Sequence, residues 1–201
     1  MSDTPNATRH GAEPSWVGSM GGPLVVVPVS AVHRWDGCTE DGVIVGGTDQ
    51  HDDYDRACAV DDLAGVISLR DAGPVSALVL GDEPASTCYL AEHRAFVRWL
   101  AADSDTELLA AAEAVLNDSA TPWQECGTWE TDGPAVLMDS AEAGGDLGVP
   151  YPDGKGQPDE APVPVPAGRW RVRAFHRRAR ESASVGVVQL LPEADLTEGA
   201  S

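Results

Sequence analysis

The sequence predicts an α+β fold with a mainly antiparallel sheet, two central helices and long acidic loops. Three observations lead to this prediction. Short runs rich in Val, Leu and Ile, bounded by Gly and Pro, occur in both the first and the last third of the chain. Two stretches near the middle carry apolar residues at helical spacing. Acidic segments without apolar periodicity separate these elements.

The first 80 residues contain three candidate strands. Residues 24–28 form a continuous apolar run, which is typical of a strand buried on both faces. Two short strands are expected at 65–69 and 75–80, because the Asp-Ala-Gly-Pro sequence at 71–74 favours a hairpin turn. Residues 37–53 are expected to form an acidic loop or short hairpin.

Two helices are predicted in the middle of the chain. The first is expected to open at the turn of residues 81–90 and to run to about Ala101. The second is expected to begin at Ser104, because Ser104 and Glu107 fit a capping box. Apolar residues that can share one helical face are Leu90, Phe96, Val97 and Leu100 in the first helix, and Leu108, Leu109, Ala112, Val115 and Leu116 in the second.

From about residue 126 the chain is expected to return to strands. The patterns predict strands at about 126–131 and 134–138. Residues 140–166 are rich in Gly, Pro and acids, which indicates a long surface loop with extended polyproline character. Period-two alternation at 169–175 and an apolar run at 185–191 predict a final pair of strands.

A chain of 201 residues fits a single domain with a full core. We expect residues 15–192 to form it, with disordered polar tails at 1–14 and 193–201. The first 14 residues lack the apolar segment of a signal peptide, and no apolar run approaches the ~20 residues that span a bilayer. A cytoplasmic location is therefore expected. The four widely spaced cysteines, Cys38, Cys58, Cys88 and Cys126, do not form a zinc-binding pattern.

The chain is strongly acidic. Its net charge of −20 arises from 33 acidic against 13 basic residues. Such a charge repels nucleic acids and anionic membranes and attracts basic partners. High solubility alone is an equally simple explanation. Arg169, Arg171 and Arg173 share one face of a predicted strand, but the overall charge argues against nucleic-acid binding there and favours a solvated face.

The sharpest candidate site lies in the acidic segment 49–55. Carboxylates and the histidine of this segment are ligand types for divalent cations, but the spacing of an EF-hand is absent. A solvated acidic loop is the simpler interpretation, and a partner interface is the next. The predicted partner-binding residues are Asp49, Asp52, Asp53, Asp55, Glu142, Asp146 and Asp153. No catalytic, cofactor-binding or metal-ligating residue is assigned.

Several motifs occur in order along residues 16–192. The most distinctive is the segment 78–90, which continues into 96–104. The others are Trp16, residues 21–28, 53–58, Trp129, 133–134, 139–140, 168–170 and 189–192. Together they resemble the immunity protein 21 family of bacterial polymorphic toxin systems.

The resemblance implies a protein that binds and neutralises a cognate toxin without catalysis, and it transfers no functional residue. The acidic charge further suggests a basic, nuclease-like toxin as the partner. Two alternatives remain open. One is a metal-dependent enzyme that uses His51, Asp52, Asp53 and Asp55. The other is a general acidic regulator that mimics nucleic acid.

Overall fold

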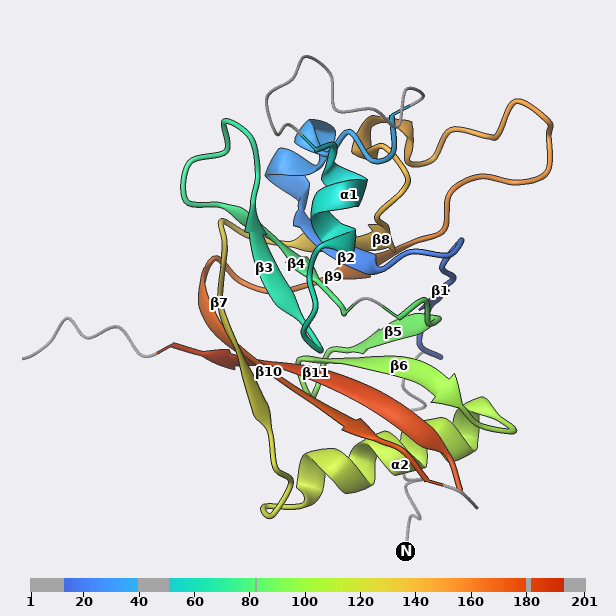
Figure 1. Ribbon diagram of the computed structural model, residues 1–201, viewed down its shortest axis with the longest axis vertical. Helices are drawn as coiled ribbons and strands as arrows, with labels where there is room; N and C mark the ends of the chain where they lie inside the picture. Colours follow the sequence, from blue (N-terminus) through green and yellow to red (C-terminus); the bar gives the residue numbers. More distant parts are fainter. Residues whose placement is uncertain (1–12, 40–50, 82, 180–181, 194–201) are drawn as a thin grey trace, which may run out of the picture.

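Two antiparallel sheets packed face to face form the body of the molecule. The computed structural model describes residues 13–39, 51–81, 83–179 and 182–193. Within these residues a long helix covers the outer face of one sheet, and short helical segments cover the outer face of the other (Figure 1). Every strand pairing in these ranges is antiparallel, which confirms the predicted α+β class with antiparallel pairing. The strands form two sheets, whereas the sequence predicted one.

The larger sheet has six strands in the order β1-β5-β6-β11-β10-β7. Its strands are β1 (Trp16–Val17), β5 (Thr87–Leu90), β6 (Ala95–Ala101), β7 (Gln124–Thr131), β10 (Gly168–Arg177) and β11 (Ser184–Pro192). The final two strands pair from Trp170 opposite Pro192 to Arg177 opposite Val185. The predicted strands at 126–131, 169–175 and 185–191 are therefore confirmed.

The smaller sheet has five strands in the order β3-β4-β2-β8-β9. They are β2 (Leu24–Pro28), β3 (Gly65–Ser68), β4 (Ser76–Val79), β8 (Ala135–Asp139) and β9 (Glu160–Val163). All five residues of β2 are buried, as the apolar run predicts. Strand β9 lies within the stretch that the sequence predicts to be loop. Its Pro162 is exposed on an edge strand, where a missing N–H costs no ladder hydrogen bond.

The main core lies between the two sheets. Trp129 of β7 is fully buried there, and its indole Nε1 donates to the backbone oxygen of Ser76 on β4 at 2.8 Å. This hydrogen bond joins the two sheets directly. Phe96, Trp170 and Leu190 of the larger sheet pack in the same cluster.

Helix α2 (Asp105–Asn117) confirms the second predicted helix. Its buried residues Leu108, Ala112 and Val115 pack against the outer face of the larger sheet. The Ser104 side chain accepts from the Glu107 backbone N–H at 3.2 Å, and the Glu107 carboxylate accepts from the Asp103 N–H at 3.2 Å. In a capping box the Glu side chain accepts from the N–H of the N-cap residue itself. Here it accepts from the N–H of Asp103, one residue earlier.

Replacing Ser104 with alanine should lower the free energy of unfolding by about 1 kcal/mol, because the Glu107 N–H loses its acceptor. Urea unfolding of wild type and variant would measure the difference. Ser15→Ala is the matched control, since Ser15 is exposed outside any strand or helix and should change the free energy by less than about 0.5 kcal/mol. Equal effects of the two substitutions would show that the cap does not stabilise α2.

The first predicted helix is wrong. Residues 87–101 form the hairpin of β5 and β6, joined by the turn Ala91–Arg94. Both faces of β6 are buried at its start: Phe96 points to the core between the sheets, and Val97 points to α2. A strand buried on both faces loses the alternation that distinguishes it from a buried helix.

None of the helices within the described ranges is long and apolar enough to cross a membrane. The predicted tails lie outside these ranges, apart from Glu13, Pro14 and Glu193. Glu193 continues the β10 pairing, because its N–H donates to the Arg169 oxygen at 2.9 Å.

Candidate functional site

The outer face of the smaller sheet carries three short helical segments. They are η1 (Val29–Arg34), α1 (Asp53–Cys58) and η2 (Gly144–Asp146), which lie together at the top of Figure 1. Residues 36–39, 51–58 and 139–159 form the surface of this region, which we call the acidic face. These ranges contain nine acidic residues, Asp36, Asp52, Asp53, Asp55, Asp139, Glu142, Asp146, Asp153 and Asp159, against Arg56 and Lys155. Arg70 reaches in from outside the ranges and pairs with Asp36 and Asp53, and two of the nine acids, Asp53 and Asp139, are buried.

Residues 36–39 connect the two acidic segments that the sequence places far apart. The Cys38 N–H donates to the Ala141 oxygen at 2.9 Å, and the Tyr54 N–H donates to the Gly37 oxygen at 3.3 Å. Gly37 has a φ of +64°, and a Cβ there would lie 2.5 Å from the Ala141 oxygen. A glycine is therefore required for this close approach. The structure thus brings segment 51–58 next to segment 139–159.

Asp53 is buried, with only 1% of its surface exposed. Its carboxylate accepts the Asp36 N–H at 2.8 Å and contacts Arg56 at 2.9 Å and Arg70 at 3.2 Å. These contacts hold α1 against the neighbouring segments. Asp53 therefore has a role within the fold, and its contact with a partner stays a prediction.

Asp52 and Asp55 have different surroundings on the same short helix. The Asp52 carboxylate caps α1 by accepting from the Asp55 N–H at 2.8 Å, and it also accepts from the Thr39 N–H at 3.0 Å. Burial raises the pKa of Asp52, but the hydrogen bonds from Thr39 and Asp55 outweigh it and hold the pKa below its usual value. Asp55 is exposed and pairs with the His51 ring at 3.6 Å.

The side chains of this segment are used separately and do not converge on one point. Asp52 caps the helix, Asp53 is buried with two arginines, and Asp55 faces His51. Within the described ranges no three His, Cys, Asp or Glu side chains are placed to hold a metal ion. Asp49 lies outside these ranges. The arrangement therefore lends no support to a metal-dependent enzyme built on residues 51–55.

The other predicted contact residues lie on the segment 139–159. Asp146 and Asp153 are exposed, and Asp153 contacts the Lys155 amine at 3.5 Å. Glu142 is partly buried and accepts from the Tyr151 hydroxyl at 2.7 Å. This hydrogen bond to Glu142, with some burial, raises the pKa of Tyr151 to about 12, so the phenol stays protonated at neutral pH.

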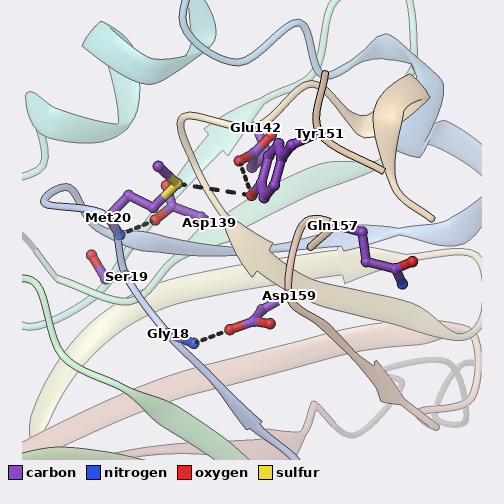
Figure 2. Close-up of a pocket in the computed structure, with 8 residues that line it drawn as sticks. All are labelled: Gly18, Ser19, Met20, Asp139, Glu142, Tyr151, Gln157 and Asp159. Atoms are coloured by element: carbon purple, nitrogen blue, oxygen red, sulfur yellow. Dashed lines mark hydrogen bonds between the residues drawn. The ribbon is translucent and has the colours of Figure 1, made fainter. Parts of the chain in front are cut away.

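A pocket with a volume of about 330 Å³ opens in the acidic face. It is lined by Gly18, Ser19, Met20, Asp139, Glu142, Tyr151, Gln157 and Asp159 (Figure 2). Sequence reasoning found only Glu142 among these residues. The others come from residues 18–20 and from scattered positions of segment 139–159, so no local pattern joins them.

The sequence of this chain matches a known protein family. The family model described as immunity protein 21 matches residues 15–183. The chain belongs to the immunity protein 21 family. The resemblance found in the sequence is thereby confirmed. No curated protein and no solved structure matches the chain.

In this member of the immunity protein 21 family, the most distinctive motif serves the fold. Residues 78–104 carry the chain from β4 in the smaller sheet to β5 and β6 in the larger one. Arg98 of β6 is 1% exposed, bonds the Glu83 oxygen and lies 3.4 Å from His176. Gly81 has a φ of +71°, and a Cβ there would lie 2.5 Å from the Arg98 guanidinium. The motif thus builds the connection between the sheets.

The three arginines of the predicted strip on β10 are also accounted for by local contacts. Arg169 pairs with Glu193 at 3.0 Å, and Arg171 pairs with Glu125 at 3.5 Å. Arg173 lies over the ring of Trp123 at 4.2 Å. This strip therefore has acidic and aromatic neighbours, as expected for a solvated strand face.

Proposed function

We propose that this immunity protein 21 family member binds and neutralises a cognate protein toxin in the cytoplasm of the cell that produces it. Family membership supports an immunity role. The acidic face is the observation that carries the proposed mode of binding, since two segments distant in sequence meet there and its ranges hold nine acids against two bases, with Arg70 from outside them paired to Asp36 and Asp53. The protein acts by occupying the toxin's surface and needs no reactive group.

The charge of this face suits a basic, nuclease-like toxin. Asp55, Asp146 and Asp153 are exposed and project negative charge into solvent. Clustered charge of one sign raises association rates with an oppositely charged partner by about 10- to 1000-fold at low salt. Carboxylates on such a face occupy the positions that phosphates would take on a nuclease.

Co-expression with the product of an adjacent gene tests the function directly. We expect cells to survive the toxin only when this chain is present, and the purified proteins to form a 1:1 complex. A stable complex should bury about 1,200–2,000 Å². Recovery of many basic proteins from a lysate, with no dedicated partner, would favour a general nucleic-acid mimic instead.

The triple variant Asp55→Asn, Asp146→Asn, Asp153→Asn should associate with the toxin about tenfold more slowly at low salt, with a weaker salt dependence. The matched control is Glu92→Gln, Glu113→Gln, Asp118→Asn, which removes three exposed charges beside and on α2. Stopped-flow mixing over a range of NaCl concentrations measures both. Equal slowing by the two variants would show that net charge, and not the acidic face, steers association.

A further inference from the structure

The pocket in the acidic face combines buried and exposed carboxylates. Asp139 lines it but is only 3% exposed. The Asp139 carboxylate accepts the Met20 N–H at 2.6 Å and the Ala141 N–H at 2.8 Å, both from neutral donors. No Lys, Arg or His within the described part of the chain forms an ion pair with it. The two N–H donors hold the carboxylate at the base of the pocket, where it contributes negative potential.

Two further carboxylates face the same space. Glu142 is held in place by the Tyr151 hydroxyl at 2.7 Å, and Asp159 lies 3.4 Å from the Gly18 N–H (Figure 2). Tyr151 stays protonated and donates to Glu142, which fixes the direction of both side chains. The pocket lining within the described residues includes three acids and no base. It is therefore a preformed, electronegative recess.

The pocket also has an apolar rim. Met20 is 74% exposed, and its sulfur lies 4.0 Å from the Tyr151 hydroxyl. Exposed Met and Tyr side chains are enriched at protein interfaces, and the flexible Met thioether adapts to a partner's shape. An apolar rim above a charged base matches a side chain with an aliphatic stem and a cationic head.

We propose that this pocket receives a Lys or Arg side chain of the toxin. The proposal rests on the proposed function and names the chemistry of its central contact. The volume of about 330 Å³ lies at the lower end of ligand-binding cavities and suits one long side chain. A bare divalent cation fits less well, because no three acidic, His or Cys side chains in the described ranges are close enough to hold one.

A small-molecule titration tests the pocket without the toxin. Butylguanidinium carries the head and stem of Arg, and N-butylurea has nearly the same shape without charge. We expect butylguanidinium to shift the amide NMR signals of Gly18, Met20 and Gln157 saturably at millimolar concentration. N-Butylurea should bind at least tenfold more weakly. Equal shifts from both compounds, or shifts without saturation, would overturn the proposal.

Variants test the same pocket in the complex. Glu142→Gln with Asp159→Asn removes two charges from the pocket and preserves shape. Asp146→Asn with Asp153→Asn removes two charges from exposed positions outside the pocket lining. Loss of a buried charge contact accelerates dissociation, whereas loss of exposed charge slows association. We therefore expect the pocket pair to raise the dissociation rate at least tenfold and the outer pair to change it less than threefold.

The two proposals fail differently. If wild type binds the toxin and the pocket pair dissociates no faster than the outer pair, the pocket proposal is overturned and the immunity function stands. If wild type binds no toxin, the proposed function fails. In that case the butylguanidinium titration decides whether the pocket recognises a basic side chain.

Discussion

Replacing Trp129 with alanine should lower the free energy of unfolding by about 3–5 kcal/mol. Trp129 is fully buried between the sheets, and its indole is hydrogen-bonded to the Ser76 oxygen at 2.8 Å. Truncation leaves a cavity at the centre of the core and a carbonyl that loses its donor, and both changes are unfavourable. Urea or guanidinium unfolding followed by far-ultraviolet circular dichroism gives the measurement.

Trp123→Ala is the matched control. Trp123 is only partly buried, packs against the cluster beneath α2, and lies under Arg173. The same change in side chain should cost clearly less there, about 1–2 kcal/mol, because solvent can fill the space. If Trp129→Ala and Trp123→Ala lower the free energy of unfolding equally, the core between the sheets is not the main source of stability. Trp129→Phe should lower the free energy of unfolding less than Trp129→Ala does. Its benzene ring fills part of the cavity but cannot donate to the Ser76 oxygen.

Sequence patterns predicted the secondary structure best where a single cause, such as burial or helix capping, determined the residue pattern. The run Leu24–Pro28 is continuous and apolar because β2 is central in its sheet and buried on both faces. The alternation at 169–175 reflects β10, which is buried on one side and solvated on the other. The Ser104 cap marked the start of α2 to the residue.

The failure at residues 87–101 has an equally specific cause. The turn Ala91–Arg94 contains no Gly, Pro, Asn or Asp, although Arg94 has a φ of +47° that usually favours such residues. No turn signal therefore divided the segment. Because the start of β6 is sandwiched between α2 and the smaller sheet, its apolar residues follow one another without alternation. Tertiary packing, and not local preference, decides this structure.

The acidic face shows the same limit at the level of function. Composition indicated that acidic segments could contact a partner. The proximity of 51–58 to 139–159, however, depends on hydrogen bonds through residues 36–39. Asp139, which ends a buried strand, gives no sequence signal that it lines a pocket. Residue type alone also cannot distinguish the roles of neighbouring acids in one run. Asp52 caps α1, Asp53 is buried and pairs with Arg70, and Asp55 is exposed to solvent.

Asp53→Ala should lower the free energy of unfolding by about 2–3 kcal/mol. The substitution removes the acceptor of the Asp36 N–H and leaves Arg56 and Arg70 without their shared buried partner. Both arginines are partly exposed, so water compensates some of the loss. Hydrogen exchange should accelerate in 36–39 and 51–58 before it does so in the core between the sheets.

Asp55→Ala separates this structural role from contact with a partner. Asp55 lies two residues further along the same helix, is exposed, and makes one weak ion pair with His51. Its removal should change stability by less than about 0.5 kcal/mol and slow association with the toxin. Asp53→Ala should weaken binding only because a fraction of the molecules has an unfolded acidic face. Lowering the temperature should reduce that fraction and restore much of the affinity for the toxin. If Asp53→Ala is as stable as wild type yet fails to bind at any temperature, Asp53 contacts the partner directly and its buried position changes on binding.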